Sequence, residues 1–355
     1  MASKYNVALQ VVLFCISLVV ANSVHFSYPA VFNFGDSNSD TVDAMDLPFL
    51  NAYLDSVGLP NFHHGCNYAT AGSTILPANA ASISPFGFGS QVSQFLLFKT
   101  RVHELLAGKK FHEYVPAEDY FEKGLYMFDI GQNDIGGAFY SKDLDEILFL
   151  IPTYLLEFES GIKRLYDSGA RNFWIHNTGP LGCLAQNVAT FGADKSKLDE
   201  LGCLRGHNQA AKAFNLHLQA FCSKLQGQYL DVNVIYVDIF TIKSNLIANY
   251  SKHVFPRCPA GYAAATSVIF IQTYYRRFEE PIMACCGYGG LPLNFDSRVS
   301  CGLTKILSNG TTITAKGCND SSVYVNWDGT HYTEAANQYV ASQILTGNYS
   351  NTHLS

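Results

Sequence analysis

The sequence is poor in charged residues and contains no basic run. Only 15% of its 355 residues are charged, against 48% that are hydrophobic, which excludes an intrinsically disordered chain. The formal net charge is −6, and an acidic balance without a basic cluster argues against a nucleic-acid partner. Beyond the N-terminal segment, the nearest candidate for a membrane span is the apolar run 263–271, which is far too short. We therefore expect a globular chain with no stable membrane span.

Several familiar catalytic and metal-binding motifs are also missing. There is no C-x-x-C pair, which disfavours a zinc ribbon or a thioredoxin-like site. Neither H-E-x-x-H nor a Walker A sequence occurs, and the absence of G-x-S-x-G disfavours an ordinary α/β-hydrolase. We expect no metal and no organic cofactor.

The N-terminal segment has the pattern of a secretory signal peptide. Lys4 supplies a positive charge, residues 7–20 are almost all apolar, and the small residues Ala21 and Ser23 follow in an arrangement that signal peptidase accepts. The apolar run is too short to span a bilayer comfortably, which disfavours the alternative of a signal anchor. We interpret residues 1–23 as a cleaved signal peptide and residues 24–355 as a single secreted domain.

Secretion changes how the cysteines are interpreted. Ten are present, Cys15 lies in the predicted signal peptide, and in an oxidising compartment the other nine should mostly form disulfides. Because nine is odd, one thiol should lack a partner within the chain. Four N-x-S/T sequons are candidate glycosylation sites: Asn249, Asn309, Asn319 and Asn348.

The hydrophobic pattern predicts an α/β fold. Short apolar runs typical of buried parallel strands occur at 30–34, 125–130, 173–175 and 234–237. Helical periodicity occurs at 143–166, 207–225 and 334–345, and Pro152 should kink the first helix or mark its start. This alternation predicts a three-layer α/β/α sandwich with a mainly parallel sheet. Polar residues at the carboxyl ends of three strands, at 35–37, 131–134 and 177–179, are then the default site.

Candidate catalytic residues occur at two of these strand ends and near the C-terminus. Ser37 follows the first strand in a turn expected to lead into a helix, whose N-terminus would stabilise an oxyanion. His331 follows Asp328 by three residues, a spacing at which the carboxylate can orient an imidazole that acts as general base. Asn133 and the small-residue turn at Gly72 offer further oxyanion donors. Taken alone, the Ser37 and Asp328–His331 segments are more typical of a helix cap or a turn than of a catalytic site.

Taken together, in this order, the motifs resemble the plant GDSL esterase/lipase family of the SGNH hydrolase superfamily. The similarity covers most of the mature chain. Residues 67–72 and 284–290 resemble the early-nodulin-like and latex-esterase-like branch, some members of which are called α-L-fucosidases.

The resemblance implies a secreted serine hydrolase that cleaves carboxylic esters through an acyl-enzyme. Ser37 would be the nucleophile, His331 the base and Asp328 the residue that orients the base. The backbone N–H groups of Ser37 and Gly72 and the amide of Asn133 would form the oxyanion hole. The candidate substrates are cell-wall acetyl esters, lipids and specialised metabolites, and we expect a monomer located in the cell wall or apoplast.

Two other functions remain open from the sequence. An α-L-fucosidase-type glycosidase would need two suitably separated carboxyl groups, for which Asp36, Asp134 and Glu279–Glu280 are available. A non-catalytic, truncated member of the family is the other alternative.

Two segments depart from the family pattern. A long stretch that the family carries after the serine motif is missing near 41–46. Neighbouring parallel strands need a crossover of about a dozen residues, so either 47–53 does not form the usual strand or the sheet is perturbed after its first strand. An additional stretch lies near 254–277 and contains Cys258, without which the mature cysteine count becomes even. We interpret both departures as products of an imperfect gene model or an alternative transcript.

Overall fold

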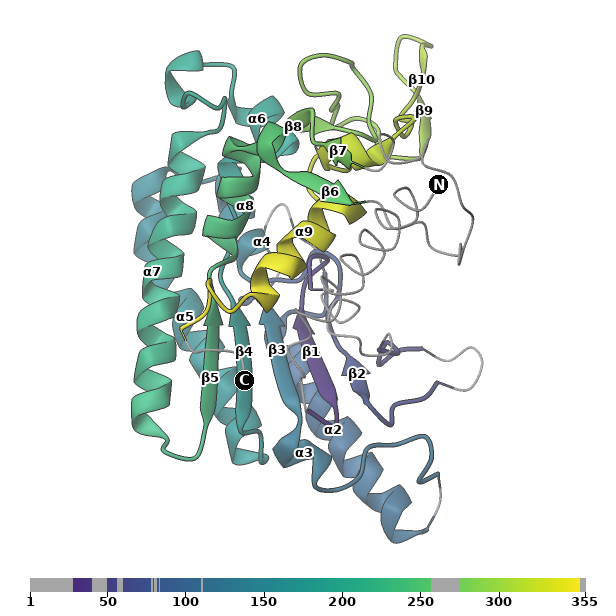
Figure 1. The fold of residues 1–355 in the computed structure, drawn as a ribbon, viewed down its shortest axis with the longest axis vertical. Helices are drawn as coiled ribbons and strands as arrows, with labels where there is room; N and C mark the ends of the chain where they lie inside the picture. The colour runs from purple at the N-terminus through teal and green to yellow at the C-terminus, as the bar shows by residue number, and fades with distance from the viewer. Residues whose placement is uncertain are drawn as a thin grey trace, which may run out of the picture.

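A five-stranded, fully parallel sheet forms the centre of the protein in the computed structural model (Figure 1). The structure describes residues 28–39, 50–55, 60–77, 79, 82, 84–109, 111–256 and 275–351. The strand order is β2-β1-β3-β4-β5. The strands are β1 (Val31–Gly35), β2 (Gly65–Asn67), β3 (Leu125–Asp129), β4 (Asn172–His176) and β5 (Asn233–Val237).

Both faces of the sheet are buried, which explains the nearly continuous apolar character of its strands. Alternate side chains point to opposite faces. One face is largely aromatic and includes Phe32, Phe34, Tyr126, Phe128 and Phe173. The opposite face carries Val31, Leu125, Met127, Trp174 and Ile235.

Helices cover each face and complete the predicted three-layer α/β/α arrangement. The aromatic face packs against α2 (Phe88–Ala107), α5 (Leu144–Asp167) and α7 (Arg205–Gln228). The other face packs against α8 (Ile239–Ala248) and α9 (Glu334–Leu345) (Figure 1). The shorter helices are α3 (Tyr120–Lys123), α4 (Gln132–Ala138) and α6 (Ala185–Phe191).

The start of α5 differs from one of the predicted alternatives. The helix runs through Pro152, so this proline does not mark its first residue. A capping box starts the helix instead: the Asp143 side chain accepts a hydrogen bond from the backbone of Glu146, whose side chain accepts one from the backbone of Asp143.

Smaller β-structures lie beyond the carboxyl ends of the sheet strands (Figure 1). They are the parallel pair β8 (Glu280–Ala284) and β11 (Tyr324–Asn326), the antiparallel pair β9 (Thr304–Ile306) and β10 (Thr312–Thr314), and the antiparallel pair β6 (Val254–Pro256) and β7 (Tyr275–Arg277). Single-turn 3-10 helices occur at Leu181–Cys183, Lys195–Lys197, Tyr250–Lys252 and Ser321–Val323.

The region of the predicted deletion is only partly described. The predicted signal peptide, residues 40–49 and residues 257–274 lie outside the described residues. Within 50–53, Ala52 forms a single parallel bridge with Asn67 and no strand. The neighbour of β1 is instead β2, and the chain between Gly35 and Gly65 is long enough for a parallel crossover.

Three disulfides form within the described residues, and this confirms the expectation that most cysteines pair. They are Cys183–Cys203, Cys285–Cys318 and Cys286–Cys301. Cys66 and Cys222 are buried free thiols, and Cys258 lies outside the described residues. Among the helices that the structure describes, none is both long and apolar enough to cross a membrane.

Candidate active site

The end of β1 places Ser37 at an exposed position on the carboxyl edge of the sheet. The preceding turn passes very close to β3: a Cβ at Gly35 would lie 2.3 Å from the Asp129 carbonyl oxygen, so only glycine fits. The Asp36 N–H donates to that same carbonyl at 3.1 Å. Chain order reverses between β1 and β3, and this is where parallel α/β sheets bind their ligands.

Gln91 of α2 holds this turn from the buried side. Its Oε1 accepts from the Gly35 N–H at 2.9 Å, and its Nε2 donates to the Gly35 carbonyl at 2.8 Å and to the Phe86 carbonyl at 3.0 Å. Gln91 is fully buried, so these bonds fix the backbone that leads to Ser37. Gln91 is not evident from the sequence, because no local pattern marks a glutamine that pairs with a strand 56 residues away.

A continuous hydrogen-bonded chain joins Ser37, His331 and Asp328. The Ser37 Oγ lies 2.7 Å from His331 Nε2, and His331 Nδ1 lies 2.7 Å from Asp328 Oδ2. The hydrogen bond to Asp328 raises the pKa of His331, while burial opposes it. Burial alone would raise the pKa of Asp328, but hydrogen bonds from His331 outweigh it and hold that pKa below its ordinary value. This arrangement allows the imidazole to accept the serine proton and become a stabilised imidazolium.

The Asp328–His331 segment is a tight loop after β11, held by backbone hydrogen bonds. The Trp327 N–H donates to the His331 carbonyl at 2.7 Å, and the Gly329 N–H donates to Asn326 Oδ1 at 2.7 Å. Gly329 has a φ of +103°, and a Cβ there would lie 2.4 Å from the Phe295 ring, so glycine is required.

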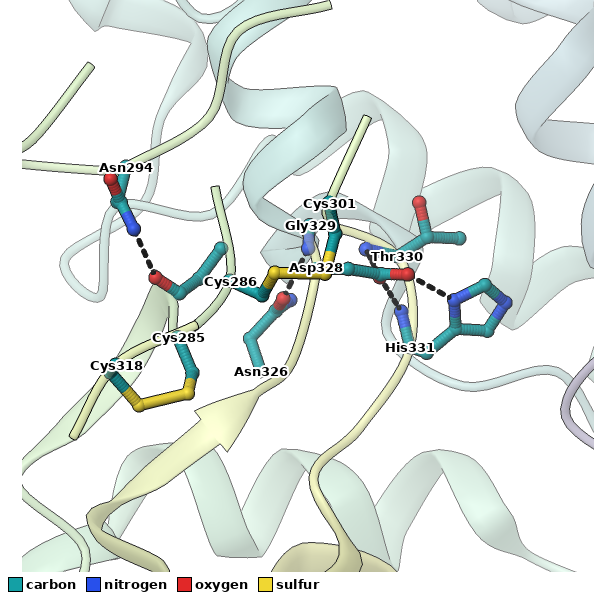
Figure 2. The surroundings of a disulfide bond; sticks show 11 residues. Cys285, Cys286, Asn294, Cys301, Cys318, Asn326, Asp328, Gly329, Thr330 and His331 are labelled. Carbon is teal, nitrogen blue, oxygen red and sulfur yellow. Dashed lines mark hydrogen bonds and ion pairs between the residues drawn. A yellow bond between two sulfur atoms is a disulfide. The ribbon is translucent and has the colours of Figure 1, made fainter. Parts of the chain in front are cut away.

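Two disulfides lie against this loop (Figure 2). The N–H groups of Cys285 and Cys286 donate to the carbonyls of Asn326 and Trp327 at 3.0 and 2.6 Å. The adjacent cysteines are in turn cross-linked to Cys318 and Cys301. The strand that leads to Asp328 is thereby held to a covalently closed segment.

A second glutamine, Gln186, contacts the loop from α6. Its N–H donates to the Gly329 carbonyl at 3.0 Å, and its Oε1 accepts from Thr330 Oγ1 at 2.8 Å. Gln186 was also missed by the sequence analysis, since it lies 144 residues before its partner.

The predicted oxyanion donors are brought to the same edge as Ser37. Gly72 lies in the turn after β2, where the Thr70 N–H donates to the Gly35 carbonyl at 3.1 Å. Asn133 is the second residue of α4, after β3, and its Nδ2 donates to the Ser73 carbonyl at 2.9 Å. The N–H groups of Ser37 and Gly72 have no acceptor among the described residues.

Two buried carboxyl groups support the edge. Burial and the neighbouring Asp129 raise the pKa of Asp36 to about 7, and its Oδ1 accepts from Gln132 of α4 at 2.6 Å. Burial likewise raises the pKa of Asp134 to about 7, although it accepts from the N–H groups of Ile75 and Leu76 at 2.8 and 3.1 Å. Through these bonds α4 ties the Ser37 turn to the segment after Gly72.

Comparison with known proteins identifies the family. A family model described as GDSL-like Lipase/Acylhydrolase matches residues 31–344. The chain belongs to this family. A GDSL esterase/lipase of Arabidopsis thaliana is 55% identical over 397 aligned residues, which cover 98% of this chain and 95% of the relative. A second one is 52% identical over 364 residues, 92% of this chain and 90% of the relative.

A third similar protein of Arabidopsis thaliana, Alpha-L-fucosidase 3, is 33% identical, and the alignment covers 92% of each chain.

The family model and the GDSL esterase/lipase relatives confirm the family predicted from the motifs, together with the α/β fold and the class of ester hydrolases. The alignment with the first relative spans 397 positions, which is more than the 355 residues of this chain. The first relative therefore has residues that this chain lacks.

Proposed function

We propose that the protein is a secreted serine esterase in which Ser37 attacks a carboxylic ester, His331 is the general base and Asp328 orients His331. The 2.7 Å contact between Ser37 Oγ and His331 Nε2 carries this proposal, because it joins residues 294 positions apart in the sequence. A serine hydroxyl needs such a base to act as a nucleophile near neutral pH.

The reaction proceeds in two halves. Ser37 Oγ bonds to the ester carbonyl carbon while its proton moves to His331 Nε2, and the imidazolium then gives this proton to the departing alcohol. Water adds to the acyl-enzyme with His331 again as base, and the acid leaves. Asp328 accepts from His331 Nδ1–H throughout, which fixes the tautomer and stabilises the imidazolium.

The negative oxygen of each tetrahedral intermediate is bound by the backbone N–H groups of Ser37 and Gly72 and by the side-chain amide of Asn133. Two observations support this assignment: both N–H groups are without an acceptor among the described residues, and Asn133 is fixed beside Ser73. Removing one such donor typically lowers kcat by about 10²–10³-fold.

The location and the substrate class extend the proposal. Three disulfides and the predicted signal peptide support secretion. Among the proposed glycosylation sites, Asn309, Asn319 and Asn348 are exposed and Asn249 is partly exposed. The substrates that suit an exposed serine in this compartment are cell-wall acetyl esters, lipids and specialised metabolites, and the monomer is the form we propose to act on them.

The decisive test is a Ser37→Ala variant assayed on p-nitrophenyl esters of graded acyl length. We expect the variant to lose about 10³-fold or more of the parent rate, since the oxyanion donors alone remain. A fluorophosphonate probe should label the parent protein and not the variant. Equal hydrolysis by both proteins would contradict the proposal, and an inert but folded parent would identify a non-catalytic family member.

A glycosidase is less well supported. It draws on a relative named as a fucosidase and on carboxyl groups suited to general acid and base work. Asp36 and Asp134 are both buried, and each is already engaged by hydrogen bonds from the protein. Release of p-nitrophenol from a p-nitrophenyl fucoside by the Ser37→Ala variant would favour this alternative.

A further inference from the structure

A lysine is buried beside the active site although the proposed reaction does not use it. Lys243 lies on α8, and only 7% of its surface is exposed. Its ammonium nitrogen lies 4.3 Å from the centre of the Tyr332 ring. A buried ammonium is unfavourable unless neighbouring groups compensate its charge, so its position calls for an explanation.

The end of β4 provides the space for this side chain. A Cβ at Gly179 would lie 3.0 Å from Lys243 Cδ and 3.8 Å from Nζ, so any larger residue would press on the lysine. Gly179 belongs to the third polar strand end of the sequence analysis, 177–179, which contributes no group to the proposed reaction. The strand end thus accommodates the lysine rather than a substrate.

Lys243 faces both halves of the active site. Tyr332, which it contacts, directly follows His331. The lysine also interacts electrostatically with Asp129 at the end of β3 and with Asp36, which directly precedes Ser37. The buried Oδ2 of Asp36 has no hydrogen-bond partner among the described residues.

The ammonium interacts electrostatically with Asp36, Asp129 and His331. His176 of β4 joins this group through Asp129, whose Oδ2 lies 3.4 Å from His176 Nδ1. Burial lowers the pKa of Lys243, and the carboxylates of Asp129 and Asp36 oppose this effect. The lysine is therefore the cation of a buried network at the carboxyl edge.

We propose that Lys243 is a positioning residue: its ammonium, seated on the Tyr332 ring, holds the His331 loop to the sheet edge that carries Ser37 and compensates the buried carboxylate of Asp36 and the partly exposed one of Asp129. The inference rests on the proposed esterase function. A charge in this position acts through the geometry and field around Ser37 and His331 without touching the substrate.

The first experiment measures the nucleophilicity of Ser37 directly. The rate of labelling by a fluorophosphonate is compared among the parent, Ser37→Ala, Lys243→Met and Lys212→Met proteins. Lys212 is the matched control, because its ammonium also lies over a ring, 5.4 Å from the centre of Phe240, but the residue is exposed. Labelling of the parent and not of Ser37→Ala establishes the esterase site before Lys243 is judged.

We expect Lys243→Met to slow labelling by about 10–100-fold, since small misplacements of catalytic groups cost about this much. On a p-nitrophenyl ester, kcat should fall while KM stays nearly constant, because the lysine is buried away from substrate. Lys212→Met should match the parent. If the parent protein is labelled and Lys243→Met is labelled at the same rate, the proposed role of Lys243 is overturned, while the proposed esterase function still stands.

A second variant separates charge compensation from simple packing. If Lys243 neutralises Asp129, the double variant Asp129→Asn/Lys243→Met should be more active than Lys243→Met, because both charges are then absent. A packing role predicts instead that the two losses multiply, and this outcome would overturn the proposed compensation.

A third experiment uses two variants of Tyr332 and applies if Lys243→Met does not fold. Tyr332→Phe keeps the ring face beneath the ammonium, whereas Tyr332→Leu removes it. We expect Tyr332→Phe to be labelled at nearly the parent rate and Tyr332→Leu about tenfold more slowly. Equal rates for these two variants would overturn the proposed link between Lys243 and the His331 loop.

Discussion

The two halves of the active site are built in different ways. Ser37 follows a strand of the central sheet, between two layers of helices, and its turn is fixed by the fully buried Gln91. His331 follows β11, which lies outside the five-stranded sheet. Its loop is held by the disulfides of Cys285 and Cys286 (Figure 2). Gln186 also contacts this loop, by accepting a hydrogen bond from Thr330.

The two halves of the active site are therefore stabilised by different interactions. The serine half is part of the cooperative core, so disturbing it should destabilise the whole fold. The histidine half depends on local cross-links and a few hydrogen bonds, so disturbing it should reduce activity before it reduces stability. The Ser37–His331 hydrogen bond spans the boundary between them.

The largest effect expected within the histidine half comes from Asp328→Asn. Loss of the carboxylate removes the partner of His331 Nδ1 and should lower kcat by about 10³–10⁴-fold with little change in the melting temperature. The matched measurement is thermal unfolding of the same preparation. A fall in kcat of less than tenfold would contradict the assigned role of Asp328.

The same variant has a signed effect on pH dependence. His331 must be neutral to accept a proton, so kcat/KM of the parent falls as pH drops through its pKa, which the hydrogen bond to Asp328 raises. In Asp328→Asn this stabilisation of the imidazolium is lost, and the acid limb of the profile should move to lower pH. An acid limb that stays at the same pH, or that moves to higher pH, would contradict the assignment of His331 and Asp328 as a pair.

The next largest effect should come from the disulfide beside the loop. Cys286 and Cys301 close a segment with a sequence separation of 15, and such a cross-link stabilises by about 3 kcal/mol. Replacing both with serine should lower activity by about tenfold or more, because the loop moves relative to Ser37, while far-UV circular dichroism stays close to that of the parent.

Cys183 and Cys203 provide the control for this variant. They are joined across a separation of 20 and lie on the segment between β4 and α7, so their replacement should affect stability more than kcat. If both serine pairs lowered kcat equally at matched stability, the histidine half would have no special dependence on its disulfides.

The sheet was predictable from the sequence because its strands are apolar runs that end at polar residues. The four predicted strands agree with β1, β3, β4 and β5 to within two residues at each end. By contrast β2 is only three residues long, Gly65–Asn67, and is defined by pairing with β1 rather than by a pattern of its own. No helix was predicted over α2, although Phe88, Val92 and Phe95 recur at helical spacing.

The site was predictable only where motifs are local. Short local motifs mark Ser37 and the Asp328–His331 pair as candidate catalytic residues, and the family resemblance placed them in one site. Gln91, Gln186 and Lys243 carry no such signal. Each acts on a segment far away in the sequence, so only the folded chain brings it to the residue that it supports.

The smallest effects on kcat should come from substitutions of Gln91 and Gln186. One glutamine supports each half of the active site, so the two variants compare the halves directly. Gln91→Leu removes the side-chain acceptor of the buried Gly35 N–H, which costs about 1–3 kcal/mol, so the free energy of unfolding should fall. Gln186→Leu removes the acceptor of the Thr330 hydroxyl, which is only partly buried, so stability should change by about 1 kcal/mol or less and kcat by only a few-fold. Urea unfolding and kcat, measured on both variants, test the contrast. If Gln186→Leu unfolded as readily as Gln91→Leu, the loop that carries His331 would belong to the same cooperative unit as the sheet.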